Sequence, residues 1–430
     1  MNQVAVYGMA RSGVAAAEVL VRQGSSVVCI DQRPDAPVVP GTVQVYGGDA
    51  RAAVLAADAV VVSPGVPASH ADLVAAVAAG IPVIGELAWA ASQIAAPILA
   101  VSGTNGKSTT THLLGQLCGN AGLRTFTGGN IGVPLSSAIG TPWDVVVVEV
   151  SSYQMEFPGE FRPHAAAILN LTPDHLERHG SLENYGAHKC RMFARMGPND
   201  AAIVPANDPR LIRLANAHPG RRAFLGDSPG VRIDGDALRL DGIHDPGEVS
   251  LAGFPLPGRH NRENIAAAAL LALSAGLWRR DLSVSNLQGL PHRMQIIADI
   301  SGVRWIDDSK ATNVEAALAA YSGLEGPFIA LLGGRGKAGA GYEAMGESLR
   351  RARAIHCFGE DGAVIRDALA LADLKASVFP RMVDAVGAAA AVAKDGDAVV
   401  LSPACASFDE FANFEHRGRV FQALVEGMRP

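Results

Sequence analysis

The chain has 430 residues, which is more than one ordinary domain holds, so we expect two or three domains. Its net charge of −6 is mild and it has no long basic run, which argues against nucleic acid as a main partner. The five cysteines are scattered without a CxxC pair, as is typical of reduced, buried thiols. The N-terminus lacks a signal-peptide pattern and no apolar run is long enough to span a bilayer, so we expect a cytoplasmic protein without a membrane partner.

The first block of the chain predicts a βαβ unit. An apolar strand, Val4–Tyr7, is followed by the turn Gly8–Gly13, an Ala-rich helix, and a second strand, Ser26–Ile30, which ends at Asp31. The turn resembles the dinucleotide-binding pattern, but Ala10 stands where the middle glycine would allow backbone to approach a pyrophosphate. This departure argues against NAD as the ligand.

A third strand of this block, Asp58–Val62, ends in the rigid loop Ser63–Pro67. Ligands of open α/β sheets bind at the carboxyl ends of strands. We therefore expect a ligand to contact this loop as well as the turn after the first strand.

The second block carries the strongest signal for a phosphate site. An apolar strand, Ile98–Val101, precedes the glycine loop Ser102–Ser108, and a helix is expected from Thr109 onward. Such a loop folds its N–H groups around phosphate oxygens, the helix dipole favours negative charge, and Lys107 adds a full positive charge. The spacing is not the full GxxxxGK[ST] pattern, because Val101 stands where the first glycine would be. The alternative interpretation is a glycine turn that caps a helix.

Two further strand ends carry groups suited to a metal ion. Glu149 lies near the end of the valine-rich strand Asp144–Val150, and His175 follows the strand Ala165–Leu169. An acid or an imidazole at the same sheet end as the phosphate loop can bind a metal ion or substrate. A surface acid and a structural histidine are the alternatives. Three other histidines, His164, His179 and His188, are interpreted as surface or packing residues.

Later segments predict a small β-rich region, a helix and a third α/β block. Residues 225–258 are rich in Gly, Asp and Pro, and a helix is expected over Asn261–Ala275, where Asn264 could contact an adenine edge or cap the helix. The third block predicts a parallel sheet with helices between the strands. Polar loops at 307–313, 333–337 and 402–409 follow three of these strands and suggest the rim of a cleft. The expected strands are Val303–Ile306, Phe328–Leu332, Ala354–Phe358 and Ala398–Leu401.

Taken in order, these motifs resemble those of the Mur ligases of peptidoglycan synthesis, over essentially the whole chain. GTNGK is shared with folylpolyglutamate synthases, whereas DSKATN and SPACASFDEF point to the members that add D-glutamate. The segments that carry the resemblance are GTNGKST, EVSSYQ, NLTPDHLERHG, HKCRMF, GRHNRENIAAA, GLPHRM, DDSKATN, LLGGRGK and SPACASFDEFANFEHRG.

The resemblance implies an α/β fold of three domains. A Rossmann-like domain over residues 1–93 would bind the UDP end of the substrate, which accounts for the altered glycine turn. A P-loop mononucleotide-binding domain over 94–288 would bind ATP, and a Rossmann-like domain over 289–430 would bind the amino acid. The implied activity is an ATP-dependent amide ligase that joins D-glutamate to UDP-N-acetylmuramoyl-L-alanine through an acyl phosphate, acting as a monomer.

The resemblance also assigns roles to individual residues of this chain. Lys107, His175, Lys189 and Lys310 would be catalytic. Two Mg²⁺ sites would use Ser108, Glu149, His175 and Lys189, with Lys189 carbamylated. ATP would contact Gly103, Thr104, Asn105, Gly106, Lys107, Ser108, Thr109, Asn264, Arg293 and Asp308. The UDP-muramoyl substrate would contact Met9, Ala10, Arg11, Ser12, Gln32, Arg33, Ser63, Pro64, Gly65, Asn130, Ser151, His175 and Lys310, and D-glutamate would contact Thr312, Lys337, Ser407, Phe408 and Phe414.

Three other functions remain open from the residues alone. The βαβ unit with Asp31 would suit an NAD-dependent oxidoreductase, although Ala10 argues against it. A P-loop switch protein without small-molecule chemistry would leave the polar loops of the third block unexplained. A ligase that adds an L-amino acid or polyglutamate to another carboxylate would use the same phosphate loop.

Overall fold

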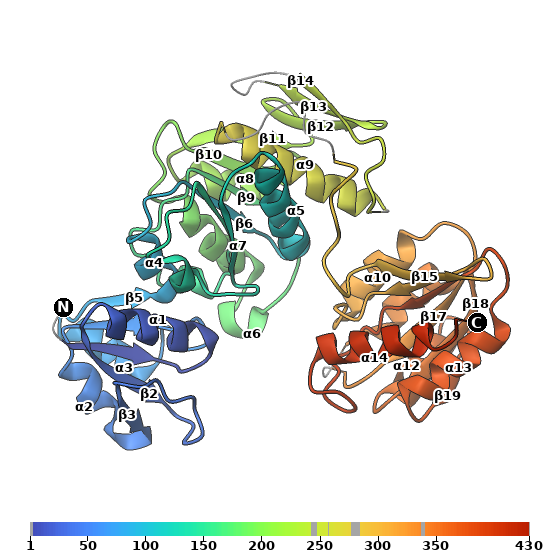
Figure 1. Ribbon diagram of the computed structural model, residues 1–430, viewed down its shortest axis with the longest axis horizontal. Coiled ribbons are helices and arrows are strands. Elements are labelled where there is room, and N and C mark those ends of the chain that lie inside the picture. The colour runs from blue at the N-terminus through green and yellow to red at the C-terminus, as the bar shows by residue number, and fades with distance from the viewer. Residues whose placement is uncertain (1–2, 242–246, 257, 277–283, 337–339, 430) are drawn as a thin grey trace. The chain divides into compact units, whose positions relative to one another are not determined.

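The computed structural model describes residues 3–241, 247–256, 258–276, 284–336 and 340–429. Its described residues form three sheets, each flanked by helices (Figure 1). By contacts the chain divides into two compact units. The first comprises Met1–Phe254 and Glu263–Leu287, and the second comprises Pro255–Arg262 and Gln288–Pro430. The first two sheets both belong to the first unit, and each unit is described by itself.

The N-terminal sheet is a five-stranded parallel sheet in the order β3-β2-β1-β4-β5. The strands predicted after Met1 and around Ser26 and Asp58 are confirmed, while the short strands β3 and β5 were not predicted. The bounds are β1 Gln3–Tyr7, α1 Arg11–Arg22, β2 Ser26–Asp31, β3 Val43–Tyr46, α2 Ala50–Leu55, β4 Ala59–Val62, α3 Ala71–Ala78, β5 Val83–Gly85 and α4 Glu86–Ala91.

The central sheet has nine strands in the order β14-β13-β12-β11-β10-β9-β6-β8-β7, and only β12 to β14 pair antiparallel. The strands β6 and β8 are buried at every position, because the sheet is covered on both faces. Helix α5 packs on β7 and β8. The bounds are β6 Ile98–Ser102, α5 Lys107–Asn120, β7 Thr125–Gly129, β8 Val145–Glu149, β9 Ala165–Ile168, α6 Leu176–His179, α7 Leu182–Cys190, β10 Ala201–Pro205, α8 Pro209–Asn216, β11 Arg221–Leu225, β12 Gly230–Asp234, β13 Ala237–Asp241, β14 Gly247–Ser250 and α9 Arg259–Ser274.

The sheet of the second unit has the order β15-β16-β20-β17-β18-β19. It is parallel as predicted except for β15, which was not predicted and pairs antiparallel with β16. The reason is a two-residue hairpin turn, since Ser301 and Gly302 both have positive φ, 54° and 76°. The bounds are β15 Gln295–Ile300, β16 Val303–Asp307, α10 Val314–Ser322, β17 Phe328–Gly333, α11 Gly346–Leu349, β18 Ala352–Phe358, α12 Gly362–Ala370, β19 Ser377–Phe379, α13 Met382–Val392, β20 Ala398–Leu401 and α14 Phe414–Glu426.

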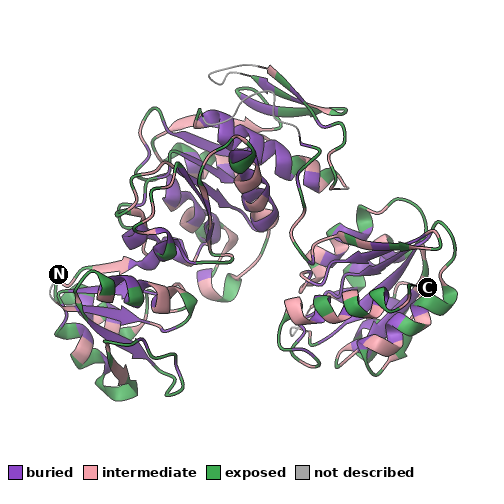
Figure 2. Cartoon of the chain, in the orientation of Figure 1, coloured by how far each residue is buried: buried purple, intermediate pink, exposed green. Residues whose placement is uncertain are grey.

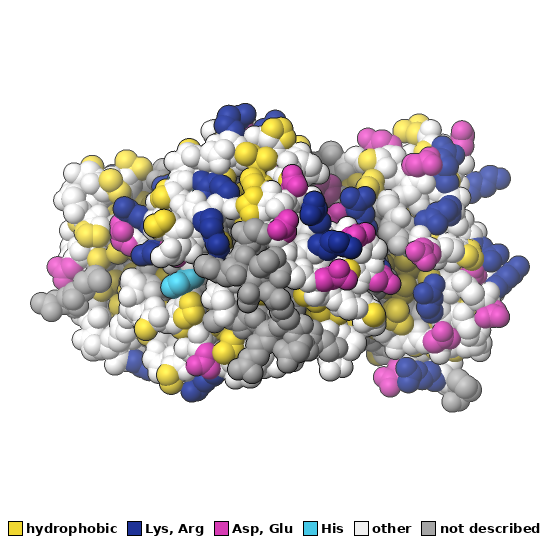
Figure 3. Space-filling model, turned by 90° about the horizontal axis from the view of Figure 1, so that it is seen from above, with side chains coloured by type: hydrophobic (Ala, Val, Ile, Leu, Met, Phe, Trp, Pro, Cys, Tyr) yellow, Lys and Arg dark blue, Asp and Glu magenta, His cyan; other side chains and the backbone are white. Residues whose placement is uncertain are grey.

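Burial follows the sheets. The strands and the inward faces of the helices are buried, and exposed residues gather on loops and outer helix faces (Figure 2). On the face drawn in Figure 3, basic and acidic side chains are interspersed. The five cysteines are free and buried, as predicted. Within the described part of the chain, no helix combines the length and the apolar character needed to cross a bilayer.

Candidate active site

The predicted phosphate loop joins β6 to α5, and the helix begins at Lys107, two residues before the predicted start. The turn requires glycine at two places. Gly103 and Gly106 have φ of 143° and 82°, a region that other residues rarely adopt. A Cβ on Gly106 would also lie 2.5 Å from Asn264 Oδ1. Lys107 and Ser108 therefore occupy the first helical turn, where the backbone N–H groups have no acceptor within the helix.

Asn170, which the sequence analysis did not single out, holds this loop in place. Its Oδ1 accepts hydrogen bonds from the N–H groups of Thr104 and Asn105, at 3.1 and 2.8 Å, and its Nδ2 donates to Asn105 O at 3.1 Å. Thr172 N donates to Thr104 Oγ1 at 3.1 Å. The segment after β9 thus fixes the loop after β6, and the parallel pairing of these two strands brings the segments together.

Two lysines lie at the base of the loop. Lys107 Nζ donates to the carbonyl oxygens of Gly103 and Thr104, at 2.9 and 2.6 Å, and Lys189 Nζ donates to the same Gly103 oxygen at 2.9 Å. Lys189 is buried, and its amine lies 4.3 Å from the centre of the Tyr185 ring. Burial, followed by repulsion from Lys107, holds the pKa of Lys189 well below its ordinary value. The site therefore disfavours the charged form of this amine relative to a lysine in water.

A buried carboxylate at the end of β8 has one oxygen to spare. Glu149 Oε1 accepts a hydrogen bond from Asn130 Nδ2 at 2.7 Å, while Oε2 is buried and has no hydrogen-bond partner among the described residues. An orphaned carboxylate oxygen at a phosphate loop suits a hard cation. No group of three His, Cys, Asp or Glu side chains with metal-binding spacing occurs in the part of the chain that the structure describes. A Mg²⁺ ion here would thus complete its shell with hydroxyl, phosphate and water oxygens.

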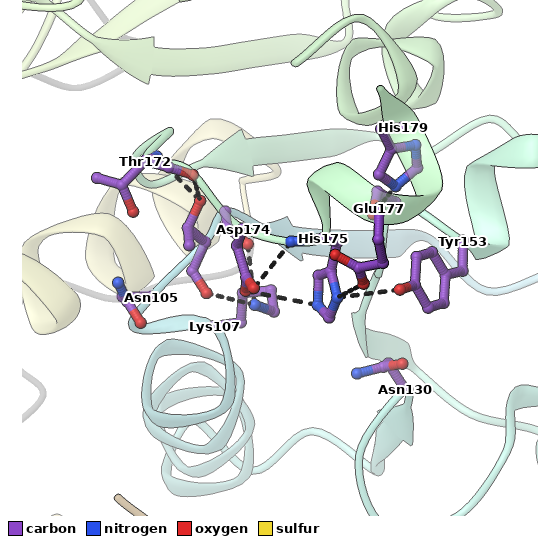
Figure 4. A network of polar contacts seen from close by, with 12 residues as sticks. Asn105, Lys107, Asn130, Tyr153, Thr172, Asp174, His175, Glu177 and His179 are labelled. Carbon is purple, nitrogen blue, oxygen red and sulfur yellow. Dashed lines mark hydrogen bonds and ion pairs between the residues drawn. The ribbon is translucent and has the colours of Figure 1, made fainter. Parts of the chain in front are cut away.

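Figure 4 shows His175 near Lys107 and Asn130. Its backbone φ of 52° places it in the left-handed region at the start of the short helix α6. The Tyr153 hydroxyl lies 2.9 Å from His175 Nδ1, and Asp174 Oδ2 lies 3.4 Å from Nε2. Both ring nitrogens therefore have neighbours that fix the orientation of the imidazole.

His179, interpreted from the sequence as a surface or packing residue, is buried and packs between aromatic rings. Its ring centre lies 5.6 Å from that of Tyr153 and 5.3 Å from that of Tyr185. His179 Nε2 lies 3.0 Å from the Ser152 hydroxyl. Burial lowers the pKa of His179 to about 4, so the ring is neutral at pH 7.

Asn264, the other residue of this unit that is predicted to contact ATP, also lies at the phosphate loop. The Thr110 hydroxyl on α5 donates to Asn264 Oδ1 at 3.2 Å, and Ser108 and Thr109 on the same helix are buried. Ser151, a predicted substrate residue, follows β8, and its N–H donates to Gln154 Oε1 at 2.8 Å. The structure thus gathers the loop, Asn264 and Glu149 around one end of α5.

The predicted UDP residues occupy the corresponding strand ends of the N-terminal sheet. Asp31 accepts from Met9 N at 2.7 Å and from Arg33 N at 2.9 Å, and Ser63 Oγ donates to Gly8 O at 2.6 Å. Burial opposes ionisation of Asp31, but the hydrogen bonds from Arg33 and Met9 outweigh it and lower the pKa. Ala10 lies on the same turn, and Arg11 and Ser12 begin helix α1. The loops that follow β2 and β4 carry Gln32, Pro64 and Gly65.

The second unit carries the remaining predicted site residues. Asp308 is buried and accepts hydrogen bonds from Ser402 Oγ at 2.6 Å and Met294 N at 3.1 Å. Burial raises the pKa of Asp308 to about 7. Lys310 Nζ lies 5.8 Å from the Phe414 ring centre. Ser407 is buried, Thr312 and Arg293 are half-buried, Phe408 is exposed, and Lys337 lies outside the described residues.

Arg417, which sequence reasoning missed, ties the three polar loops of this unit together. Its side chain is fully buried and donates to Ser309 O at 2.8 Å, Cys405 O at 3.0 Å and Gly333 O at 3.4 Å. The oxygens of Ser309 and Cys405 belong to the loops after β16 and β20, and Gly333 is the last residue of β17, where the third loop begins. The loops predicted to form the rim of a cleft are therefore held side by side. A charged residue on the amphipathic helix α14 is expected to face solvent, so the sequence does not predict the burial of Arg417.

Comparison with known proteins agrees with this arrangement. Three family models match, namely the Mur ligase MurD-like N-terminal domain over residues 2–85, the Mur ligase middle domain over 101–272, and the Mur ligase glutamate ligase domain over 292–405. The chain therefore belongs to the Mur ligase family, as its relatives also show. It is 38% identical to the UDP-N-acetylmuramoylalanine–D-glutamate ligase of Pelotomaculum thermopropionicum, with 100% of this chain and 98% of the relative covered. It is 39% identical to the protein of the same name from Myxococcus xanthus, with 99% and 98% covered.

Solved structures share the fold. The MurF ligase of Thermotoga maritima, determined in complex with ADP, superimposes with a TM-score of 0.63 at 17% identity, covering 99% of this chain and 95% of that one. The UDP-N-acetylmuramate–alanine ligase MurC of the same organism gives a TM-score of 0.61 at 16% identity, with 99% and 100% covered. The predicted three-domain α/β fold is thereby confirmed.

Proposed function

We propose that this chain joins D-glutamate to UDP-N-acetylmuramoyl-L-alanine with ATP, through an acyl phosphate, in the cytoplasm and as a monomer. One observation carries the proposal. The loop Gly103–Ser108 offers helix N–H groups and Lys107 beside the spare carboxylate oxygen of Glu149, within a chain that aligns end to end with ligases named for this reaction. These are the groups that a nucleoside triphosphate with its cation needs.

Phosphoryl transfer between two anions sets the chemical requirement. A free carboxylate does not form an amide, because oxide is a poor leaving group, whereas phosphate leaves readily from an acyl phosphate. The transfer brings two negatively charged groups together, so catalysis depends on positioning and positive charge. The N–H groups at the start of α5 and Lys107 would bind the ATP phosphates. On release from its present carbonyl acceptors, the Lys107 amine would meet charge that develops on the transferred group.

Mg²⁺ fits the donor set of this site. Glu149 and Ser108 would hold one ion, and His175 with Lys189 a second, where the cations would neutralise phosphate charge when bound. Burial lowers the pKa of the Lys189 amine and so raises the fraction of the neutral form, and only a neutral amine adds CO₂ to give a carbamate. The carbamate, with loss of a proton, would turn this residue into an anion. Asn130, which orients Glu149, would also contact the muramoyl substrate.

The other two substrates would bind at the strand ends of the flanking sheets. The UDP end would contact the Gly8–Gly13 turn, the loop after β4 and Arg33. The Arg33 guanidinium now pairs with Asp31, and it is the positive group at these strand ends that a diphosphate would meet. D-glutamate would contact the loops that Arg417 holds together, which include Thr312 and Ser407. The amine of D-glutamate then attacks the acyl carbon and phosphate leaves.

The dependence of phosphate release on each substrate tests the proposal. Purified protein with ATP and Mg²⁺ should release phosphate only when UDP-N-acetylmuramoyl-L-alanine and D-glutamate are both present. L-Glutamate and L-alanine should not replace D-glutamate. Phosphate release at an equal rate without either acceptor, or with L-alanine in place of D-glutamate, would contradict the proposal.

The carbamate on Lys189 has its own test. A Lys189→Ala variant should lose activity and regain part of it with a short carboxylic acid such as acetate, which can occupy the space of the missing carbamate. Lys107→Ala, treated in the same way, is the control that should not recover. Absence of rescue in Lys189→Ala at every acid concentration would contradict the carbamate.

A further inference from the structure

Glu156 and Arg178, which have no role assigned so far, form an ion pair. This pair lies between His175 and the loop after β4, which begins at Ser63 and is called the UDP loop below. Glu156 follows β8 on the turn Gln154–Glu156, and Arg178 lies on α6. Arg178 donates from Nε to Glu156 Oε1 at 2.7 Å and from Nη2 to Oε2 at 3.0 Å, which is a bidentate pair. Only 8% of the Glu156 side chain and 19% of the Arg178 side chain are exposed. A pair this buried and well aligned is costly to break from one side.

The pair binds the loop after β4 directly. Ala68 N donates to Glu156 Oε2 at 2.9 Å, and Arg178 Nη1 donates to Gly65 O at 3.4 Å. Both residues belong to the loop that begins at Ser63 and that we assign to the UDP end of the substrate. Glu156 and Arg178 lie in segments that connect strands of the central sheet. Their side chains therefore hold the loop after β4 at two backbone positions.

The guanidinium of Arg178 also contacts the tyrosine that lies against the His175 imidazole. Its guanidinium lies 4.7 Å from the centre of the Tyr153 ring, whose hydroxyl lies 2.9 Å from His175 Nδ1. His175 is three residues before Arg178 and precedes the same helical turn, and Arg178 N donates to His175 O at 3.1 Å. A shift of Arg178 would therefore move both the ring that contacts the imidazole and the backbone that carries it.

We propose that Arg178, together with Glu156, is a positioning residue that couples occupancy of the UDP loop to the orientation of His175. This inference rests on the proposed function, which identifies the loop after β4 as a UDP site and His175 as catalytic. Binding energy from the uridine end, which is remote from the reacting carboxylate, is thereby used to orient the catalytic side chain. Arg178 acts through Tyr153 and does not itself contact the reacting atoms.

The test compares the whole substrate with one that lacks the uridylyl group, 1-phospho-N-acetylmuramoyl-L-alanine. In the wild type we expect kcat to be at least 10-fold higher with the whole substrate. In Arg178→Lys, which keeps the charge but loses the bidentate geometry, kcat with the whole substrate should fall to within about 2-fold of the value for the truncated one. The matched control is Arg195→Lys, since Arg195 pairs with Glu160 at 2.6 Å on the exposed surface and contacts neither end.

A second readout does not need turnover. Titration of the full-length protein with UDP alone should shift the NMR signals of the His175 ring in the wild type and in Arg195→Lys, but not in Arg178→Lys. Glu156→Gln keeps an oxygen for Ala68 N and provides the same comparison if Arg178→Lys does not fold. The ratio to compare is kcat with the whole substrate divided by kcat with the truncated substrate. A ratio equal to that of the wild type in both Arg178→Lys and Glu156→Gln would overturn the coupling. So would a His175 signal that UDP fails to shift in the wild type, whereas absent D-glutamate dependence would contradict only the proposed function.

Discussion

Two glycine turns in this molecule share a local structure and differ in what surrounds them. Gly8–Gly13 and Gly103–Ser108 each follow a buried parallel strand and lead into a helix. In the first turn, Met9 N–H donates to the carboxylate of Asp31 at 2.7 Å. In the second, two N–H groups donate to the neutral amide of Asn170, and Lys107 begins the helix.

Under the proposed function, this difference would determine which anion each turn accepts. A carboxylate of the protein accepts an N–H group of the first turn, whereas at the second turn the neutral amide of Asn170 accepts the N–H groups and Lys107 adds a positive charge at the start of the helix. A glycine turn therefore identifies a site for backbone approach, and the side chains at the neighbouring strand ends select the ligand. Under the proposed function, the first turn would accept a diphosphate with the help of Arg33, and the second would accept a triphosphate with its cation.

The largest expected effect is on the second turn. Lys107→Ala should lower kcat by about 100- to 1,000-fold, because under the proposed function it removes the charged donor that would contact the transferred phosphoryl group. Phosphate release measures the effect, and thermal unfolding should be close to that of the wild type. Lys375→Ala, at an exposed position of the second unit, is the control. Wild-type turnover in Lys107→Ala would show that the second turn is not the ATP site.

The spare oxygen of Glu149 gives the next effect. Glu149→Gln keeps the shape and the bond to Asn130 but loses the charge, so the Mg²⁺ concentration for half-maximal activity should rise about 10- to 100-fold, the range seen when support of a metal site is removed. The measurement is phosphate release against Mg²⁺ concentration. An unchanged Mg²⁺ dependence would mean that the orphaned oxygen serves another purpose.

A smaller and different effect is expected at the first turn. Asp31→Asn weakens the hydrogen bonds from Met9 N and Arg33, and KM for the UDP substrate should rise about 10-fold while KM for ATP stays constant. Initial rates at varied substrate concentrations separate the two constants. An equal rise in the KM for ATP would remove the distinction between the two turns.

The smallest effect concerns a neutral imidazole beside the second turn. The pKa of His179 is lowered to about 4 by burial, against about 6.5 in an unfolded chain, so unfolding takes up a proton between these values. The contribution to stability is complete above about pH 6.5 and is lost as the pH falls towards 4. The melting temperature of His179→Phe should therefore drop less between pH 7 and 5 than that of the wild type. A larger drop in the variant would contradict the assignment.

The sequence predicts the second turn well because local chemistry determines it. Gly103, Gly106 and Lys107 act within one strand–turn–helix segment, and the helix begins within two residues of the predicted start. Asn170 could not be predicted, because the order β9-β6-β8 places distant segments side by side and an amide after a strand has no distinctive pattern.

The same limit applies to the second unit. Arg417 is a charged residue on a helix that the pattern places at the surface, yet it is buried because three loops supply carbonyl oxygens for its guanidinium. β15 was not predicted because its alternation of buried and exposed residues is irregular and its antiparallel pairing depends on the hairpin turn at Ser301. Tertiary pairing, more than local propensity, decides both cases.

The central claim is that the chain activates a carboxylate as an acyl phosphate at the second turn. The direct measurement uses UDP-N-acetylmuramoyl-L-alanine labelled with oxygen-18 in its carboxylate, together with ATP, Mg²⁺ and D-glutamate. We predict that the inorganic phosphate released in the reaction carries one labelled oxygen per molecule, because the carboxylate oxygen that attacks ATP leaves with the phosphate. Amide product formed together with unlabelled phosphate would contradict the account.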